Sequence, residues 1–369
     1  MRIALVHGGR TWDVGGHLHL ILAEALSGRD HEVFVAALEG NGVAGYAGAM
    51  GVEVVELPFP RRPSIMAPRT MRRVLADREA EVVHLCRFED LWTLSPPPGG
   101  RGPDIPALLT VYQRPQAALS RSWYRWLRRR VDRYTAPTPL LRRLAAGAIG
   151  GVEEEIELVP HFVDPSLYGA EDIRGRAGEI RRGWGIEAQV PVIGTLAPLR
   201  PGCGLETFLE AVRLGAPHLP RARWRIVPWP GTSTGAYAEE LAGEARTLEN
   251  LELAEPEEVT AALFHALDIF VFPVEREGYA RSLLQAMASG VPVVAVEGPA
   301  TSFIIENDRS GLLVQPGDAL ALAGAAAQIL GDPDLRQRLA RGGRQRVLSQ
   351  FSSDVLLPRY EDLYRSLGA

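Results

Sequence analysis

Short apolar runs alternate with segments of helical spacing along the chain, and the alternation occurs twice. The apolar runs contain few polar residues, which is typical of strands buried on both faces. Because helices separate these runs, they predict parallel sheets in an α/β fold. We therefore expect two successive doubly wound units of similar size. The expected strands are residues 2–7, 32–38, 52–58, 81–86, 107–112, 190–196, 223–229, 268–274 and 291–296, and the expected helices include 17–28, 205–215, 259–267, 280–290, 319–332 and 332–348.

Length and composition favour a globular protein of two domains. The chain has 369 residues, more than one hydrophobic core usually supports. Its 46% hydrophobic and 23% charged residues are ordinary for a folded protein with large buried cores. The net charge of −5 argues against a dedicated nucleic-acid binder, which is usually basic. We expect no nucleic-acid partner.

The first residues and the cysteines give no sign of export. The N-terminal apolar run breaks at His7-Gly8-Gly9, which is too short for a signal peptide. No apolar run approaches the roughly 18 residues of a membrane span. Cys86 and Cys203 lie in different halves of the chain, so we expect small buried side chains and no disulfide framework. The expected location is the cytoplasm.

The sequence contains no lysine, and its 40 basic residues are all arginine. This excludes Schiff-base chemistry on lysine and the lysine of a phosphate-binding P-loop. An anion must therefore be bound by arginine side chains, by backbone N–H groups or by helix N-termini.

One polar cluster, EREGYARSLLQAMASGVPVVAVEG at 275–298, follows an expected strand and opens an expected helix. The helix start and Arg281 favour an anion, and Glu277 can accept hydrogen bonds from hydroxyl groups. Gln285 lies one turn beyond Arg281 on the same side of the helix. The cluster therefore predicts a site for a sugar joined to a nucleoside diphosphate. The alternative is a solvated loop followed by an ordinary amphipathic helix.

The stretch EGYARSLLQAMASGVPVVA resembles the signature of the retaining glycosyltransferases of family 4, enzymes of the two-domain GT-B type. In that family the first glutamate of the motif contacts the donor sugar, the helix start binds the diphosphate, and a second glutamate holds the ribose hydroxyls. The resemblance assigns Glu277 to the first glutamate. Gln285 replaces the second.

Further stretches carry the resemblance along nearly the whole chain. Gly15-Gly16 resembles the family's N-terminal glycine pair, whose backbone approaches the donor phosphates and the acceptor. VPHFVDPSLY (159–168) is similar to the segment that leads into the linker. Residues 298–318 resemble the loop and strand after the donor site, and residues 351–367 resemble the helix that crosses back to the first domain.

The resemblance implies a GT-B architecture, in which two Rossmann-like doubly wound domains face a deep interdomain cleft. The N-terminal, acceptor-side domain is expected at 1–165, joined by a C-terminal helix at 352–369. A linker is expected at 166–189 and the nucleotide-sugar donor domain at 190–351.

Several positions depart from the family pattern. Thr195 stands where the family usually has an arginine, and Arg200 stands where it has a lysine. Tyr112 and Gln113 occupy the place where many members have an active-site histidine. Gln285 can still hydrogen-bond ribose hydroxyls, but without the strength that the charge of a carboxylate adds.

The expected function is transfer of a sugar from a nucleotide-diphosphate-sugar donor to an acceptor hydroxyl with retention, without a metal or another cofactor. The acceptor is expected to be a glycan, a lipid-linked sugar or a small molecule. The alternative is a catalytically degenerate subunit that binds a glycan or a partner enzyme. The expected catalytic residues are Glu277 and Tyr112, and the expected donor-binding residues are Gly15, Gly16, Thr195, Arg200, Gly278, Tyr279, Ala280, Arg281, Ser282 and Gln285.

Two other motifs have competing interpretations. Residues 231–235 fit the G-x-S-x-G pattern of a serine hydrolase, but the prolines at 228 and 230 break the strand that would present Ser233. A surface loop near the donor accounts for them better. Asp332-Pro333-Asp334 superficially resembles a metal-binding Asp-x-Asp motif, but a proline at a helix start predicts that Asp332 is an N-cap.

The stretch 120–137 is expected to form a helix that leads into another strand, and its part 120–133 is rich in arginine and tryptophan. Such a helix could contact an anionic membrane surface or an acidic acceptor. The first reading would add peripheral contact with the inner membrane face to the cytoplasmic location. The alternative is a surface helix with its tryptophans packed inward.

Overall fold

The computed structural model describes residues 1–9, 14–40, 42–57, 66–95, 104–115, 126–168, 171–229, 235–254, 260–274 and 280–367. The chain divides into two compact units. Unit 1 comprises Met1–His161 and Leu356–Ala369, and unit 2 comprises Phe162–Val355.

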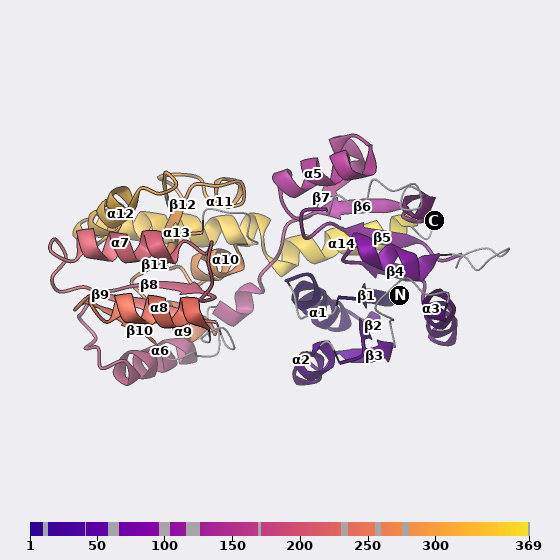
Figure 1. Cartoon of the computed structure of the whole chain (residues 1–369), viewed down its shortest axis with the longest axis horizontal. Helices are drawn as coiled ribbons and strands as arrows, with labels where there is room; N and C mark the ends of the chain where they lie inside the picture. Colours follow the sequence, from indigo (N-terminus) through magenta and orange to yellow (C-terminus); the bar gives the residue numbers. More distant parts are fainter. Residues whose placement is uncertain are drawn as a thin grey trace. The chain divides into compact units, whose positions relative to one another are not determined.

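Unit 1 is built on a parallel sheet of seven strands in the order β3-β2-β1-β4-β5-β6-β7 (Figure 1). The register starts with Arg2 opposite Glu32 and Ile3 opposite Val82, so β1 lies between β2 and β4. The strands are β1 (Arg2–His7), β2 (Glu32–Leu38), β3 (Glu53–Leu57), β4 (Val82–Leu85), β5 (Ala107–Thr110), β6 (Arg133–Ala136) and β7 (Ile156–Leu158), and the helices are α1 (Val14–Ser27), α2 (Val43–Ala49), α3 (Met66–Asp77), η1 (Phe88–Leu94), η3 (Arg128–Arg130), α5 (Pro139–Ile149) and η4 (Glu153–Glu155).

Unit 2 repeats this plan with six parallel strands in the order β10-β9-β8-β11-β12-β13. The strands are β8 (Val192–Ala197), β9 (Arg223–Pro228), β10 (Leu251–Leu253), β11 (Ile269–Phe272), β12 (Val293–Val296) and β13 (Leu312–Val314), and the helices are η5 (Pro165–Tyr168), α6 (Glu171–Gly183), α7 (Leu205–Gly215), α8 (Ala236–Ala245), α9 (Ala261–His265), α10 (Arg281–Ala288), α11 (Thr301–Ile304), α12 (Ala319–Gly331), α13 (Pro333–Gln350) and α14 (Ser353–Leu367), of which α14 continues into unit 1.

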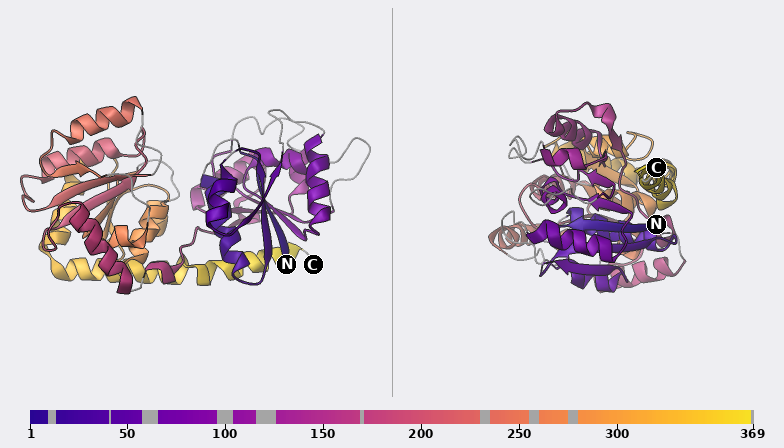
Figure 2. Two further views of the ribbon diagram at one scale, coloured as in Figure 1. Left: turned by 90° about the horizontal axis from the view of Figure 1, so that it is seen from below. Right: turned by 90° about the vertical axis from the view of Figure 1, so that its right-hand side faces the viewer.

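Helices lie on both faces of each sheet (Figure 2), so the inner strands, among them β1, β4, β5, β8, β11 and β12, are buried on both sides and largely apolar. Strands β3, β7 and β10, at or near the sheet edges, are partly exposed. On one face of the unit 2 sheet, Phe208 of α7 packs against Trp224 of β9. The other face buries Phe270 of β11, Phe264 of α9 and Met287 of α10. Each such side chain stabilises the fold by about 1.5–3 kcal/mol through removal of apolar surface from water.

The strand order places a topological switch point in each sheet. The chain leaves β1 in one direction and returns to its other side at β4, and it does the same at β8 and β11. The loops after these strand pairs turn to opposite faces of the sheet and leave a crevice at the carboxyl ends, where ligands of such folds bind. The two switch points are therefore where a site is expected.

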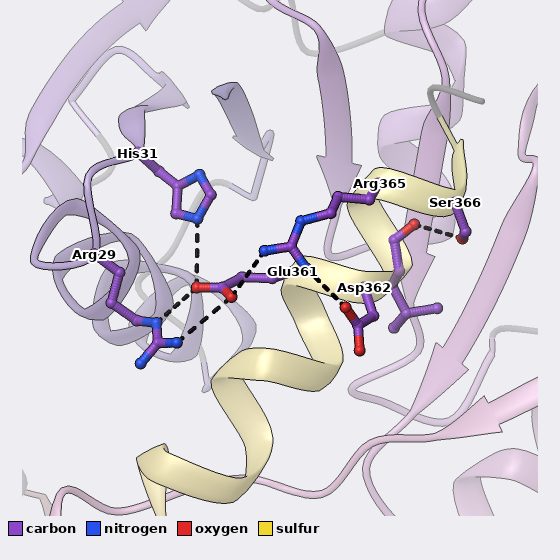
Figure 3. A network of polar contacts seen from close by, with 7 residues as sticks. Arg29, His31, Glu361, Asp362, Arg365 and Ser366 are labelled. Atoms are coloured by element: carbon purple, nitrogen blue, oxygen red, sulfur yellow. Dashed lines mark hydrogen bonds and ion pairs between the residues drawn. The ribbon is translucent and has the colours of Figure 1, made fainter.

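Helix α14 is attached to unit 1 by a buried carboxylate (Figure 3). Glu361 accepts a hydrogen bond from Arg29 Nε at 2.6 Å, and its Oε1 lies 3.4 Å from His31 Nε2. Arg365, one turn further along α14, donates to its other oxygen at 3.3 Å. These partners neutralise a charge that would otherwise be costly to bury.

Most expected elements are confirmed within a residue or two, and β1, β2 and α7 have the expected bounds. Helices α2, α3, α5 and α8 and strands β7 and β10 were not predicted. Residues 166–189, expected as a linker, belong to unit 2 and contain α6, which packs against α9. The linker prediction relied on weak patterning, because α6 is polar on most of its surface and buries only a few side chains.

Three further predictions can be compared with the structure. Asp332 caps α13 by accepting hydrogen bonds from the N–H groups of Asp334 and Leu335, as expected. Cys86 and Cys203 are buried free thiols. The arginine-rich stretch leads into β6 as expected, but residues 120–125 lie outside the described ranges. Among the helices that the structure describes, none has the length and apolar character needed to cross a bilayer.

Candidate active site

The loops after β8 and β11 meet at the switch point of unit 2. Gly204, just before α7, has φ +74°, and a β-carbon there would lie 1.9 Å from the carbonyl oxygen of Pro273. Only glycine permits this contact between the two loops. The contact brings the loop that contains Arg200 to the end of β11. Glu277, Gly278, Tyr279 and the motif at 231–234 lie outside the described residues.

Helix α10 begins at this switch point. Ala280 precedes it with φ 44° and ψ 33°, a left-handed conformation that is uncommon for a residue other than glycine. Alanine has no side chain that could cap the N–H groups of Arg281 and Ser282. The first turn of a helix carries such N–H groups and a partial positive charge, and it favours an anion. The start of α10 can therefore bind a phosphate group.

Gln285 has a partner that the sequence did not reveal. Its side chain is 5% exposed, and Nε2 donates a hydrogen bond to the Tyr168 hydroxyl at 2.9 Å. Burial raises the pKa of Tyr168, while the hydrogen bond from Gln285 and the positive charge of Arg281 lower it. Tyr168 is held in turn by His265, whose Nε2 donates to the Tyr168 carbonyl oxygen at 3.2 Å.

Gln285, Tyr168 and Arg281 therefore form one cluster beside the start of α10. Tyr168 ends the VPHFVDPSLY stretch, but nothing in the local sequence connects it to a residue 117 positions away. A buried tyrosine hydroxyl that accepts a hydrogen bond from an amide can also donate its own proton to a ligand. The cluster presents one amide oxygen, one hydroxyl and one guanidinium group.

Thr195 and Arg200, which differ from the family pattern, have different surroundings. Thr195 lies within β8, fully buried, and its hydroxyl has no hydrogen-bond partner among the described residues. Arg200 follows β8 in an exposed loop, where its N–H donates to the Pro198 carbonyl oxygen at 2.9 Å. Arg200 can therefore reach a ligand at the surface, whereas Thr195 is covered by the protein itself.

The switch point of unit 1 contains a buried histidine in a slot between glycines. His7, at the end of β1, lies so close to Gly16 that a β-carbon on Gly16 would be 2.8 Å from its Nε2. On the other side of the ring, Nδ1 lies 3.2 Å from Cys86 Sγ. Gly15 and Gly16 are both buried at the start of α1. At Gly16 the missing side chain makes room for His7.

Tyr112 lies beyond β5, which ends at Thr110, and is 3% exposed. Its ring stacks on His161 at a centroid distance of 5.6 Å, and its hydroxyl hydrogen-bonds Tyr360 on α14. Burial is the main cause that raises the pKa of Tyr112 well above its ordinary value. A tyrosine in this state is a poor general base, and the geometry favours a role in positioning.

Other buried histidines of unit 1 were also missed. His84 on β4 is hydrogen-bonded through both ring nitrogens, to Tyr364 at 2.8 Å and Thr110 at 2.6 Å. The ring of His19 lies 4.7 Å from that of His84, and neither of its nitrogens has a hydrogen-bond partner among the described residues. Burial lowers the pKa of His84 to about 3 and is the main cause that lowers that of His19. Both rings are therefore neutral at pH 7.

A pocket opens in unit 1 where β4 and β5 end. The space at its mouth amounts to about 360 Å³ when open solvent is included, and little of it is enclosed. Within the parts of the chain that the structure describes, no group of three histidine, cysteine, aspartate or glutamate side chains is arranged to hold a metal ion. The pocket is lined by Cys86, Arg87, Phe88, Glu89, Val111, Tyr112, Gln113, Arg114 and Pro115.

Both halves of the chain match models of known families. Residues 19–167 match the model described as Glycosyltransferase Family 4, and residues 190–332 match Glycosyl transferases group 1. A curated relative, the lipopolysaccharide core biosynthesis glycosyltransferase LpsE of Rhizobium meliloti (strain 1021), is 26% identical over 217 residues, or 58% of this chain and 59% of that protein. The chain spans 28% to 59% of the lengths of this protein and two other curated relatives.

Solved structures match over nearly the full length. A glycosyltransferase from Rickettsia africae ESF-5 has a TM-score of 0.83 at 16% identity, covering 99% of this chain and 98% of that one. Anabaena Alr3699/HepE, solved with UDP and glucose, has a TM-score of 0.79 at 15% identity, covering 99% and 100%. At such identities the match shows the fold alone, and it confirms the expected GT-B architecture of two doubly wound domains.

Proposed function

Because this chain belongs to the family 4 glycosyltransferases, we propose that it moves a sugar from a nucleotide-diphosphate-sugar donor to an acceptor hydroxyl and retains the anomeric configuration. Unit 2 would carry the donor and unit 1 the acceptor. The cluster of Arg281, Gln285 and Tyr168 at the start of α10 is the observation on which this proposal rests.

The diphosphate would lie against the N–H groups of Arg281 and Ser282 and the Arg281 guanidinium. Arg200, on the adjoining loop, would add a second positive charge. As the bond between the sugar and the diphosphate breaks, negative charge grows on the departing diphosphate. Fixed dipoles and cations that point at this charge lower the activation barrier of the transfer. With arginine supplying the charge, we propose that turnover needs no metal ion, and EDTA should leave the rate unchanged.

Gln285 and Tyr168 would hold the ribose. The Gln285 amide donates its proton to Tyr168, so its Oε1 can accept from one ribose hydroxyl. Tyr168 can donate to another oxygen. An amide binds a hydroxyl less strongly than a carboxylate does. The hydroxyl of Tyr168 provides a second hydrogen bond to the ribose, which offsets part of the lost binding strength.

In the proposed reaction the acceptor hydroxyl oxygen bonds to the anomeric carbon on the face that the leaving group departs from. The bond between that carbon and the diphosphate oxygen breaks, and the nucleoside diphosphate leaves with the electron pair. The proton of the acceptor hydroxyl passes to an oxygen of the leaving diphosphate, where it neutralises part of the developing negative charge. Glu277 would hold the hydroxyls of the transferred sugar.

A donor panel tests this proposal. Calorimetric titration with UDP-, GDP-, ADP- and TDP-sugars should give one tight donor, with slow release of free sugar in the absence of acceptor. Glu277→Ala should abolish this turnover while the melting temperature stays nearly unchanged. Full turnover in that variant would remove Glu277 from the site, and no binding across the panel would favour a binding subunit over an enzyme.

A further inference from the structure

A polar groove lies in unit 2 between α13 and the turn before β13, and we call it the α13 groove. The space that water can enter there amounts to about 490 Å³, and the groove is open to solvent. Small-molecule sites are mostly lined by apolar side chains, but the described residues that line this groove include none. An open, charged groove suits a segment of another chain better than a small ligand. Its charged lining residues are Asp308, Arg309, Asp334, Arg338 and Arg341.

The groove follows one exposed face of α13. Asp334, Arg338, Arg341 and Gln345 recur at intervals of three or four residues, so their side chains lie in one row along the helix. At 1.5 Å per residue this row is about 16 Å long, roughly the length of five residues of extended chain. From Leu335 to Gln350 the helix carries five arginines and no acidic residue. Beyond its first turn α13 is therefore a basic helix.

A close contact between the turn and the helix places a third arginine beside this row. A β-carbon on Gly342 would overlap the carbonyl oxygen of Arg309, so only glycine lets the turn approach α13 there. The turn has its own hydrogen bonds. The N–H of Arg309 donates to the Glu306 carbonyl oxygen at 3.0 Å, and the N–H of Glu306 donates to Ser310 Oγ at 2.8 Å. The backbone that carries Arg309 is thus already ordered, which limits the entropy lost on binding.

The arginines of the groove differ from another arginine of the same helix in their partners. Arg346 pairs with Glu306. Within the part of the chain that the structure describes, Arg309, Arg338 and Arg341 form no ion pair with a carboxylate, and Arg341 donates only to a backbone carbonyl oxygen. Like charges one turn apart on a helix repel each other, as Arg338 and Arg341 do. Carboxylates supplied from outside would relieve this repulsion.

The two aspartates of the groove indicate what kind of anion fits. Asp308 and Asp334 repel a uniformly negative chain such as nucleic acid. A carboxylate accepts hydrogen bonds, and the backbone N–H groups of a peptide can donate them. A peptide with acidic side chains therefore offers partners to both the arginines and the aspartates. Clusters of arginine are a recurring means of recognising acidic peptide motifs.

We propose that the α13 groove docks an acidic segment of a partner protein. Carboxylates of the segment bind Arg309, Arg338 and Arg341, and its backbone N–H groups donate to Asp308 and Asp334. The inference goes beyond the proposed function and does not depend on it, because the groove has this shape and charge whether or not unit 2 binds a nucleotide sugar.

Fluorescence anisotropy of the full chain with two labelled peptides tests the proposal. One peptide is GEDEDEG, and the other is its amide counterpart GQNQNQG. The acidic peptide should bind at least about tenfold more tightly, and its affinity should fall as the salt concentration rises. Arg338→Gln and Arg341→Gln should each weaken its binding about tenfold. Arg338→Lys should keep part of the affinity, since the charge remains without the planar fork.

Arg221→Gln is the matched control, because Arg221 is an exposed arginine of unit 2 that does not line the groove. It should bind the acidic peptide as the wild type does. Single-stranded oligothymidylate and vesicles of phosphatidylcholine with phosphatidylserine are the competing anions, and neither should displace the labelled peptide at equal charge concentration.

Four results would overturn the proposal. These are no measurable binding of the acidic peptide at low salt, equal affinity for the two peptides, unchanged affinity in both Arg338→Gln and Arg341→Gln, and displacement of the peptide by the oligonucleotide or the anionic vesicles. The last result would show a surface for polyanions in general.

Discussion

At the scale of single residues, the contact between Gly16 and His7 joins the start of α1 to the end of β1. Gly16→Ala places a methyl group 2.8 Å from Nε2 of His7, whose ring is fully buried with Nδ1 3.2 Å from Cys86 Sγ. We expect a loss of about 1–3 kcal/mol in the free energy of unfolding, measured by urea denaturation.

The matched control for this substitution is Gly147→Ala on α5. A β-carbon there meets nothing within 4 Å, so replacing glycine inside a helix should stabilise the unit by up to about 1 kcal/mol. Combining Gly16→Ala with His7→Ser should restore part of the loss. If the two glycine variants behave alike, the slot for His7 is not what requires glycine.

Tyr168 is the residue on which the orientation of Gln285 depends. Tyr168→Phe leaves the buried Gln285 amide without its acceptor, at a cost of about 1–3 kcal/mol. We expect donor affinity to fall about tenfold in calorimetry, because the amide can then rotate away from the ribose. Tyr237→Phe, which removes an exposed hydrogen bond to Glu206, should leave donor affinity unchanged. Equal effects of the two variants would assign Tyr168 a purely structural role.

At the scale of elements, Glu361 decides how firmly α14 holds to unit 1. Glu361→Gln removes a charge that three partners surround, with a side chain only 9% exposed. We expect a loss of about 1–3 kcal/mol at pH 7. Asp362→Asn, the next residue on α14 and 75% exposed, should cost less than about 0.5 kcal/mol.

Because Glu361 is ionised, we expect the difference in stability between the Glu361→Gln and Asp362→Asn variants to depend on pH. The hydrogen bond from Arg29 is the main cause that lowers the pKa of Glu361 below its ordinary 4.5. The stabilisation is therefore present above pH 4.5 and is lost as the pH falls through the lowered value. Denaturation curves of the two variants should converge in acid. A gap that persists at low pH would show that packing, not charge, holds α14.

At the scale of the whole molecule, we expect a falling pH to destabilise unit 1 before unit 2. His84 and His19 are neutral when folded, and burial lowers both pKa values, to about 3 for His84. The unfolded chain binds protons at these residues below pH 6.5, so stability is complete above that pH and falls as the pH drops toward 3. Each histidine contributes a slope of about 1.4 kcal/mol per pH unit.

Hydrogen exchange between pH 7.5 and 5 can measure this loss separately in the two units. Amides of β1, β4 and β5 should lose protection as the pH falls, and His84→Gln should flatten that dependence. His218→Gln, at an exposed histidine of unit 2, serves as the control and should leave it unaltered. A pH response of equal size in both units would contradict the assignment to the buried histidines.

Local patterns were sufficient for much of this fold. Buried parallel strands are apolar in continuous runs, and helices repeat every 3.6 residues, so both are visible within a few neighbouring residues. This is why β1, β2 and α7 have their expected bounds and why the N-cap at Asp332 could be assigned. Helix α6 was missed as an element because its pattern is weak.

The sequence by itself also determined the family, through the motif at Glu277 to Gln285 and the matching stretches along the chain. Only the tertiary structure decided what surrounds those residues. Tyr168 meets Gln285 across 117 positions, and Tyr364 meets His84 across 280. Such pairs depend on how whole sheets and helices pack, and no local periodicity encodes them. The same reason explains why Tyr112 proved to be buried against His161 and Tyr360.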